Sequence, residues 1–140
     1  MDQLLEYSRH HPWLAALALV TALAVLVYEL RLRLQNAASI APQEAIRLMN
    51  QGATVLDIRT QQAYSEGHIN GARHFNAAQI LTAAEPLKRY KERALIVCCD
   101  RGSTAGAAVR ALSEQGFTKV FSLRGGLAAW RAQNLPLARE

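Results

Sequence analysis

The sequence predicts an α/β fold, in which a three-layer parallel sheet has helices on both faces and is preceded by one transmembrane helix. Three observations lead to this prediction. An apolar stretch covers residues 12–28, and short β-type runs alternate with helical patterns from residue 39 onward. Charge also divides the chain, because residues 1–30 hold one arginine against three acidic residues, whereas residues 31–140 hold fifteen Lys or Arg against eight Asp or Glu. Strands that alternate with helices are typical of parallel sheets.

Composition limits the class of protein. With 140 residues, the chain has room for one domain and an appendage. Apolar residues make up 51% and charged residues 19%, which excludes a disordered chain. The two cysteines are adjacent in sequence, so a disulfide framework is also excluded. The predicted organisation is a short N-terminal tail at 1–11, a transmembrane helix at 12–30, a linker at 31–38 and a domain at 39–140.

Residues 12–28 have the properties of a membrane-spanning helix. Apart from the aromatic residues that flank the stretch, Thr21 is its only polar side chain. As a helix the stretch would extend about 25 Å, close to the hydrocarbon thickness of a bilayer. Trp13 and Tyr28 lie near its two ends, where aromatic side chains are enriched in membrane proteins. Pro12 suits the first turn of a helix, where its missing N–H is not needed.

Two alternatives to a permanent span are weaker. A domain of about 100 residues could scarcely surround a buried helix of this length. A cleaved secretory signal requires a basic N-terminal region and small residues directly after the apolar stretch. Here Glu29 and Arg31 follow the stretch, and the first suitable cleavage site comes only after Ala38. A single permanent span is therefore favoured.

Basic residues on either side of the apolar stretch predict its orientation. Only Arg9 precedes the stretch closely, whereas Arg31 and Arg33 follow it. Lys and Arg are enriched on the cytoplasmic side of a span. We therefore expect a single-pass protein of a bacterial inner membrane, with its N-terminus in the periplasm and its domain in the cytoplasm. A reducing cytoplasm also suits unpaired thiols.

The elements of the domain follow from its hydrophobic patterns. Strands are expected at residues 54–58, 72–76, 94–98 and 119–123. Helices are expected at residues 42–51, 77–90, 104–115 and 126–134. The second helical stretch is interrupted at Pro86, and Ser103 is available as the N-cap of the third. Parallel sheets bind ligands beyond the carboxyl ends of their strands, so the loops at those ends are the candidate site.

The segment LIVCCDRGST at residues 95–104 has the pattern of a nucleophile loop. Alternation along a strand predicts that Cys98 packs in the core and that Cys99 opens the loop. Gly102 permits positive φ, so backbone N–H groups of a tight loop can converge on an anion. The N-terminus of the next helix favours a thiolate, and Arg101 adds positive charge. Cys99 is therefore the candidate nucleophile.

Four motifs in order resemble the single-domain rhodanese family. They are VLDIR at residues 55–59, EGHINGA at 66–72, CDRG at 99–102 and LRGGLAAW at 123–130. The resemblance covers about residues 39–137. The apolar N-terminus and the NLPL sequence near the C-terminus are similar to the membrane-anchored YibN-type subgroup of that family.

The resemblance implies a rhodanese-like fold and sulfurtransfer. Cys99 would attack a sulfane sulfur in thiosulfate or in a persulfide, become a persulfide, and pass the sulfur to a thiol acceptor. The substrate-binding loop would comprise Asp100, Arg101, Gly102, Ser103 and Thr104. This chemistry requires neither a metal nor an organic cofactor. The expected partners are the sulfur donor, the thiol acceptor and membrane lipid.

The chain departs from the family pattern at one place. Family loops commonly follow the pattern CxxGxRS, but Thr104 and Ala105 occupy the last two positions here. The missing arginine removes an anion ligand or an ion-pair partner for Asp57. This departure favours a persulfide over thiosulfate as the donor. It also supports an alternative function, in which a catalytically weak rhodanese-like module recruits a membrane protein partner.

Other candidate sites are weaker. Asp57 and Arg59 follow a strand and are expected to border the pocket or to form a structural cap or ion pair. His68 is expected to be a turn residue. A phosphatase loop requires Cys-x5-Arg, which neither cysteine provides, and about 100 residues are too few for an α/β-hydrolase. The cysteine and histidine spacings exclude a zinc site.

The basic segment at 88–93 is expected to be a solvated helix end or to contact anionic lipid. Nucleic-acid binding has no other support.

Overall fold

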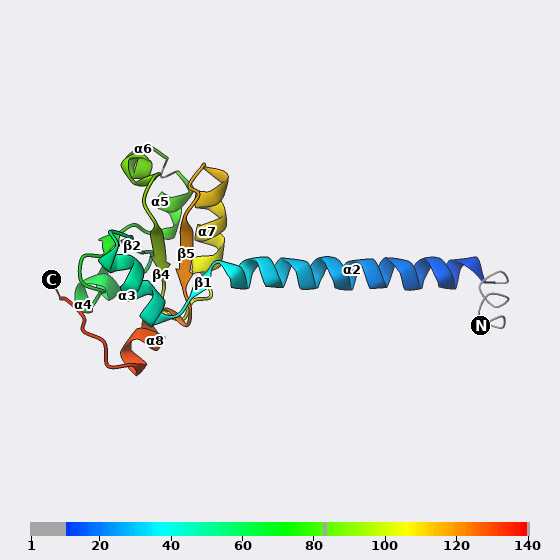
Figure 1. The fold of residues 1–140 in the computed structure, drawn as a ribbon, viewed down its shortest axis with the longest axis horizontal. Coiled ribbons are helices and arrows are strands. Elements are labelled where there is room, and N and C mark those ends of the chain that lie inside the picture. Colours follow the sequence, from blue (N-terminus) through cyan, green and yellow to red (C-terminus); the bar gives the residue numbers. More distant parts are fainter. Residues whose placement is uncertain (1–10, 83, 140) are drawn as a thin grey trace. The chain divides into compact units, whose positions relative to one another are not determined.

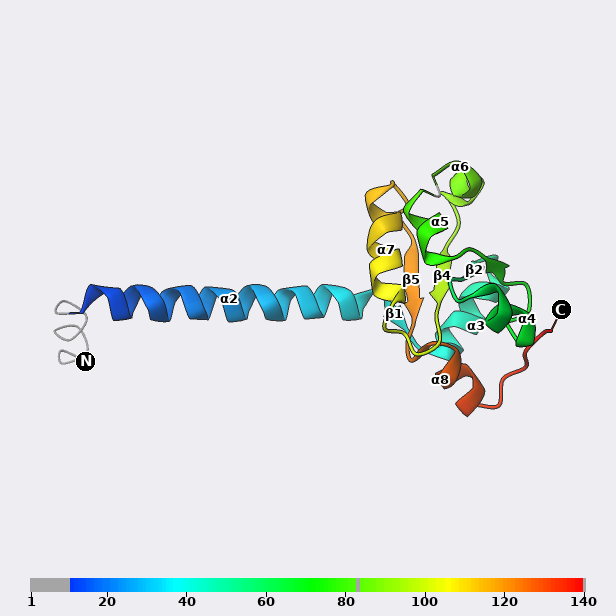
Figure 2. The same cartoon turned by 180° about the vertical axis from the view of Figure 1, so that it is seen from behind.

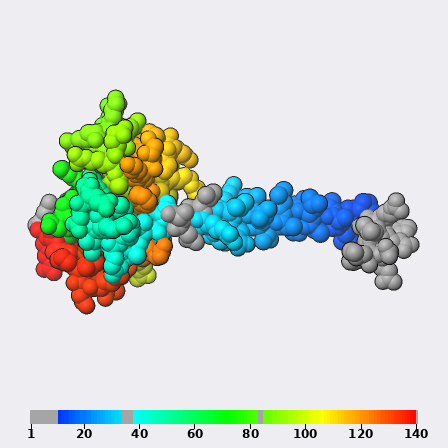
Figure 3. Space-filling view, viewed as in Figure 1, coloured from blue at the N-terminus to red at the C-terminus, as the bar shows by residue number. Residues whose placement is uncertain are grey.

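The computed structural model describes residues 11–82 and 84–139 and contains two compact units, Met1–Asn36 and Ala37–Glu140. The first unit is dominated by helix α2 (Pro12–Ala37). Its large apolar side chains are exposed around the helix, as the space-filling view shows (Figure 3). The part at Pro12–Arg33 is long and apolar enough to cross a membrane. Insertion into a bilayer remains a prediction.

Helix α2 continues beyond the segment expected to span the membrane. The sequence indicated a linker at 31–38, but the helix ends only at Ala37. Residues 31–37 contain neither glycine nor proline and include leucine and arginine, which are good helix formers. Glu29 and Arg33 also form an ion pair of 3.6 Å one turn apart, which adds modest support to the helix.

The second unit is built on a parallel sheet, as predicted. Within the described residues, five strands lie in the order β1-β5-β4-β2-β3, and every neighbouring pair is parallel. The strands are β1 (Ser39–Ile40), β2 (Thr54–Asp57), β3 (Arg73–His74), β4 (Leu95–Cys98) and β5 (Val120–Leu123). The central strand β4 is buried along its whole length. A strand that is buried on both faces is typical of a sheet between two helical layers.

Helices cover both faces of the sheet (Figures 1 and 2). One layer consists of α3 (Pro42–Asn50), α4 (Gln61–Glu66) and α8 (Gly126–Ala132). The other consists of α5 (Ala77–Leu81), α6 (Ala84–Leu87), the 3-10 helix η1 (Lys88–Tyr90) and α7 (Ala105–Glu114). Side chains alternate along β4, since Leu95 and Val97 pack under the α7 layer, whereas Ile96 and Cys98 pack under the α8 layer. The three-layer prediction is therefore confirmed.

Two short elements differ from expectation. The sequence analysis missed β1, whose two residues pair with Ser122 and Leu123, because so short a strand has no detectable alternation. It also missed α4, whose six residues form less than two helical turns. The Thr60 hydroxyl accepts a hydrogen bond from the Ala63 N–H at the start of α4, and this cap is the local signal for the helix.

Two helix boundaries also differ. The stretch expected at 77–90 consists of three pieces, and the first break lies before Pro86, which occupies the first turn of α6 where its missing N–H costs nothing. At the other boundary, α7 begins at Ala105 with Thr104 in the N-cap position and no side-chain cap. Ser103 is therefore not the N-cap that the sequence indicated, because the loop is one residue longer.

Candidate active site

The two adjacent cysteines lie on opposite faces of the sheet. Cys98 ends β4 and packs in the core beneath α8, whereas Cys99 starts the following loop and packs on the α7 side. Burial raises the pKa of the Cys98 thiol well above its usual range, and the nearby Asp57 carboxylate raises it further. Cys98 is therefore a protonated core residue at neutral pH.

Cys99 lines a cavity, and its sulfur accepts a hydrogen bond from the loop. Cys99 is 3% exposed, yet it contributes to the cavity lining. The Gly102 N–H donates to Sγ at a distance of 2.9 Å. Gly102 has a φ of +86°, which favours glycine, and this conformation turns its N–H back toward the sulfur. An N–H donor at this distance stabilises negative charge on sulfur.

Helix α8 holds the loop in place. Its Leu127 N–H donates to the Cys99 carbonyl at 2.8 Å, and its Ala128 N–H donates to the Asp100 carbonyl at 2.9 Å. The N-terminal N–H groups of a helix have no partner within the helix, so the loop carbonyls satisfy them. Gly126 has a φ of +59°, and a Cβ at this position would lie 2.7 Å from the Arg101 nitrogen. The adjacent glycines therefore permit close packing between α8 and the loop.

Asp57 and Arg59 form a buried ion pair beside this loop. Arg59 Nη2 lies 2.7 Å from Asp57 Oδ2, and its Nε also contacts the carboxylate. Burial opposes the charge on Arg59, but the hydrogen bond and attraction to Asp57 outweigh it, so the pKa of Arg59 is raised. Arg59 Nη2 also donates to the Gly67 carbonyl at 2.7 Å, and Nη1 lies 3.7 Å from Asp100.

This pair answers a question that the sequence left open. Asp57 and Arg59 were expected to border the pocket or to form a structural cap or ion pair, and the structure shows the ion pair, so Arg59 is the partner of Asp57 in a loop that lacks the family's arginine. Only Arg59 of the pair lines the cavity. Asp57 is 1% exposed and acts as the buried counter-ion that holds the Arg59 guanidinium.

The cavity has a volume of about 720 Å³ and a predominantly cationic rim. Six of the residues singled out from the sequence line it: Arg59, Cys99, Asp100, Arg101, Ser103 and Thr104. Gly102 contributes through its N–H to the sulfur rather than to the lining. The structure therefore brings the loop and the end of β2 into one site.

Five further lining residues were missed: Ile58, Thr60, Leu127, Ala128 and Arg131. Ile58 and Thr60 flank Arg59 at the end of β2, and the rule that sites lie at carboxyl ends of strands could have indicated them. The other three lie in α8. Ala128 and Arg131 are three residues apart and therefore share a helix face, which is the signal that could have found Arg131.

A second cavity, of about 590 Å³, lies between α4 and β3. His68, which the sequence analysis expected in a turn, contributes to its lining and stacks on the Tyr64 ring at 3.9 Å. The Nδ1 atom of His68 lies 2.9 Å from the Tyr64 carbonyl. His68 lies in a different cavity from Cys99, so it is not part of the candidate active site. Among the described residues, no group of three or more His, Cys, Asp or Glu side chains is arranged to bind a metal ion.

Comparisons with known proteins agree with the fold. The family model of the rhodanese-like domain matches residues 41–133. The YibN protein of Escherichia coli K12 is 30% identical over 141 residues, which cover 99% of both chains. The thiosulfate sulfurtransferase GlpE of Pseudomonas fluorescens is 41% identical over 95 residues, covering 66% of this chain and 83% of its own.

Solved structures support the same relationship. The rhodanese-like domain of an Anabaena protein is 34% identical with a TM-score of 0.56, and the match covers 61% of this chain and 97% of that one. A rhodanese-related protein from Thermoplasma volcanium has a TM-score of 0.66 at 24% identity, covering 73% of this chain and 98% of the other, which shows likeness of fold alone.

Proposed function

The chain belongs to the rhodanese-like family, and on that premise we propose that it is a membrane-anchored sulfurtransferase that carries sulfane sulfur as a persulfide on Cys99. Relatives named thiosulfate sulfurtransferase support this type of chemistry. The observation that carries the proposal is the position of Cys99, which lines a cavity together with three arginines and whose sulfur lies 2.9 Å from the Gly102 nitrogen.

The proposed reaction has two displacement steps. The Cys99 thiolate attacks the outer sulfur of the donor, an S–S bond forms at Sγ, and the bond between the two donor sulfurs breaks. The electron pair leaves with sulfite when the donor is thiosulfate, or with a thiolate when it is an organic persulfide. An acceptor thiolate then attacks the outer sulfur of the Cys99 persulfide and restores the Cys99 thiolate. Sulfur is exchanged without net oxidation or reduction.

The loop residues have distinct roles in this proposal. The Gly102 N–H stabilises negative charge on Sγ before attack and after sulfur transfer. Arg101 contributes positive charge that attracts an anionic donor. Asp100, Ser103 and Thr104 line the cavity and contact the substrate, and Asp100 also lies 3.7 Å from Arg59. The chemistry calls for neither a metal nor an organic cofactor, because the thiolate is the nucleophile.

The experiment that tests the proposal is intact mass spectrometry of the full chain after exposure to thiosulfate or to an organic persulfide. We expect an added mass of one sulfur in the wild type and in Cys98→Ser, and no added mass in Cys99→Ser. Cys98→Ser is the matched control because it changes a neighbouring thiol that faces the opposite core. Absence of an adduct on the wild-type chain would contradict the proposal.

We further propose that α2 spans a bacterial inner membrane, with the N-terminus in the periplasm and the domain in the cytoplasm. The length and apolar composition of Pro12–Arg33 and the arginines that follow support this. Alkaline phosphatase is active only outside the cytoplasm, so a fusion after Glu140 is expected to be inactive. Strong phosphatase activity would mean the opposite orientation.

A second candidate function is a binding module that recruits a membrane protein, with weak or no catalysis. The loop supports this alternative, because Thr104 makes no side-chain hydrogen bond and Ala105 is apolar, so the end of the loop offers the sulfur no charged ligand. The same mass measurement separates the two functions, since a binding module forms no adduct on Cys99.

A further inference from the structure

Beyond the nucleophile, the geometry points to an anion subsite formed by Arg131 and Arg101 at the rim of the cavity. We propose that this subsite binds a carboxylate of the sulfur donor that is remote from the reacting sulfur. The favoured donor is therefore a small organic persulfide that bears a carboxylate, such as a short peptide persulfide. This inference rests on the proposed sulfurtransferase function and adds a specificity-determining residue, Arg131, to it.

The first observation is the position of the Arg131 guanidinium. Arg131 lies one turn beyond Leu127 and Ala128 in α8 and lines the same cavity as Cys99. Its Nη2 atom lies 3.9 Å from the point where a Cβ on Gly67 would stand. The Arg59 Nη2 atom donates to the carbonyl of that same glycine. Both guanidinium groups therefore lie close to Gly67.

The second observation is that the charges at the rim are not balanced. Asp57 neutralises Arg59 in a buried pair, and the exposed Asp100 lies 3.7 Å from it. In the described part of the chain, by contrast, neither Arg101 nor Arg131 has a carboxylate within 4 Å. Cationic side chains that line one cavity without an acidic partner attract a bound anion.

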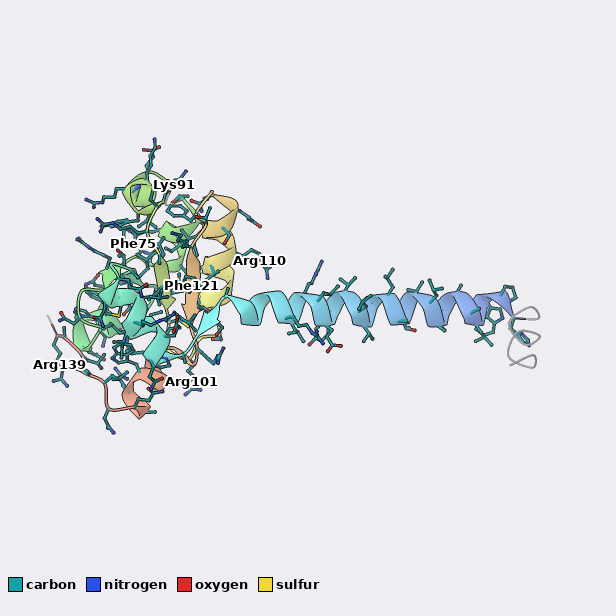
Figure 4. The ribbon with its side chains drawn as sticks, viewed as in Figure 1. Phe75, Lys91, Arg101, Arg110, Phe121 and Arg139 are labelled. Carbon is teal, nitrogen blue, oxygen red and sulfur yellow. The ribbon has the colours of Figure 1, made fainter. Side chains whose placement is uncertain are left out.

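The third observation is that Arg101 and Arg131 line one cavity and come from two elements in contact. Arg101 projects from the loop next to α8, the helix that carries Arg131 (Figure 4). The Ala128 N–H donates to the Asp100 carbonyl, so the loop and the first turn of α8 are in direct contact. Guanidinium groups bind planar carboxylates through paired N–H donors, which suits a cavity that two arginines line.

The size of the cavity distinguishes a remote carboxylate from a small oxyanion. In thiosulfate the charge lies on the group bonded to the reacting sulfur, so it would bind near Cys99 and the loop N–H groups. The cavity, at about 720 Å³, falls in the range of about 300–1,000 Å³ that holds ligands of many atoms. A larger donor can place its sulfur on Cys99 and its carboxylate at Arg131 at the same time.

The transfer step balances for such a donor. The Cys99 thiolate attacks the terminal sulfur of the persulfide RSSH, forming the Sγ–S bond. The S–S bond of the donor breaks, and the electron pair leaves with sulfur as the thiolate RS⁻. The terminal proton stays on the transferred sulfur, so the products are Cys99–SSH and RS⁻. Arg131 takes no part in bond breaking and acts only in donor binding.

The test measures persulfide formation on Cys99 in the detergent-solubilised full chain as a function of donor concentration. Three donors are compared: the persulfide of glutathione, which carries two carboxylates, the same persulfide with both acids esterified, and thiosulfate. We expect half-saturation by the acid at a concentration about tenfold below that of the ester, since a charge-assisted contact is lost with the ester. Thiosulfate serves to detect binding of a small oxyanion.

Variants assign the effect to Arg131. Arg131→Gln is expected to raise the half-saturating concentration of the acid to that of the ester, about tenfold, while the maximal rate and the ester response stay unchanged. Arg131→Lys retains charge without the planar fork and should recover part of the effect. Arg110→Gln, on the exposed surface of α7 and outside the cavity lining, removes the same charge and should change nothing.

The outcomes separate this inference from the proposed function. Equal half-saturation for acid and ester in the wild type, or an equal effect of Arg131→Gln on both, would overturn the subsite and leave sulfurtransfer intact. An effect of Arg131→Gln confined to thiosulfate would also overturn it, in favour of a small-oxyanion site. Failure of every donor to load Cys99 would overturn both the subsite and the proposed function.

Discussion

Adjacent cysteines in this chain have opposite chemical environments, and alkylation should distinguish them. Cys98 is buried beneath α8 with its pKa raised, whereas the Cys99 sulfur borders a cavity and accepts the Gly102 N–H. Only the thiolate reacts with iodoacetamide. We expect Cys98 to be alkylated at least about tenfold more slowly than Cys99 near pH 8, because each unit by which the pKa of Cys98 is raised lowers its thiolate fraction about tenfold. Peptide mass mapping over time measures both rates, and equal rates would contradict this assignment.

The raised pKa of Cys98 also predicts how stability depends on pH. Burial is the main cause of the shift, and it keeps the folded thiol protonated at pH values where the unfolded thiol, with a reference pKa of 9.0, loses its proton. The unfolded state then binds fewer protons, so the free energy of unfolding falls as pH rises past about 9. The contribution of Cys98 approaches about 1.4 kcal/mol per pH unit. Urea unfolding at several pH values should show a shallower fall for Cys98→Ala than for the wild type.

The buried ion pair between Asp57 and Arg59 at the end of β2 contributes to the free energy of unfolding, and removing its carboxylate should lower that free energy by a defined amount. Asp57→Asn leaves the guanidinium of Arg59 buried without its counter-ion, and breaking such a pair typically costs about 3–5 kcal/mol. Glu44→Gln is the matched control, because its pair with Arg47 is exposed and is worth about 1 kcal/mol or less. Trp130, which is buried, reports unfolding of the domain by fluorescence in a Trp13→Phe background. Equal losses in the two variants would mean that the Asp57 pair carries no special stability.

The sequence indicated the residues that line the cavity where chemistry and chain position coincide. Cys99 and its loop follow a buried strand and contain a glycine, so the sequence alone indicated a nucleophile loop at the sheet edge. Arg131 was missed because its place in the site depends on how α8 packs against that loop, about 30 residues away in sequence. The ion pair between Asp57 and Arg59 was one of the alternatives that the sequence left open. The family pattern directed attention to residue 104, whereas Arg59 lies two residues away on the same strand end.

At the scale of elements, the contact between α8 and the loop positions the sulfur. Gly126→Ala would place a Cβ against the Cys99 carbonyl and the Arg101 nitrogen, in a backbone conformation that favours glycine. We expect the loop to shift and sulfur loading of Cys99 to fall by about tenfold to a hundredfold, the usual effect of a small misplacement. Single-turnover loading followed by mass spectrometry measures the change.

Gly106→Ala provides the control for that experiment. Gly106 lies inside α7, and a Cβ there would meet nothing within 4 Å. Alanine is the better helix former by about 1 kcal/mol, so this variant should load sulfur normally and be slightly more stable. Normal loading by Gly126→Ala would show that the close contact with α8 is not needed to position the sulfur.

The elements themselves show what sequence patterns can and cannot define. The strands at the centre of the sheet were predicted because each is a run of apolar residues between turn signals, and the core helices α3 and α7 were predicted from their apolar faces. The missed elements β1 and α4 are too short for a periodic pattern. Their existence depends on pairing with β5 and on the Thr60 cap, which are contacts rather than patterns.

At the scale of the whole molecule, the decisive property is whether α2 resides in a bilayer. Leu19 lies in the middle of the apolar stretch and is 71% exposed, and Leu81 in the domain is similarly exposed at 68%. Leu19→Arg puts a charge at the centre of a span, which costs about 2.5–3.5 kcal/mol in membrane insertion, whereas Leu81→Arg changes only a surface in contact with water. We expect the wild type and Leu81→Arg to stay in the membrane pellet after an alkaline carbonate wash, and a substantial share of Leu19→Arg to be released.

Release of the wild type would mean that α2 does not anchor the chain, since carbonate removes only peripheral proteins. Equal release of the two variants would instead mean that added charge anywhere weakens membrane association, and the assignment of the span to Pro12–Arg33 would lose its support.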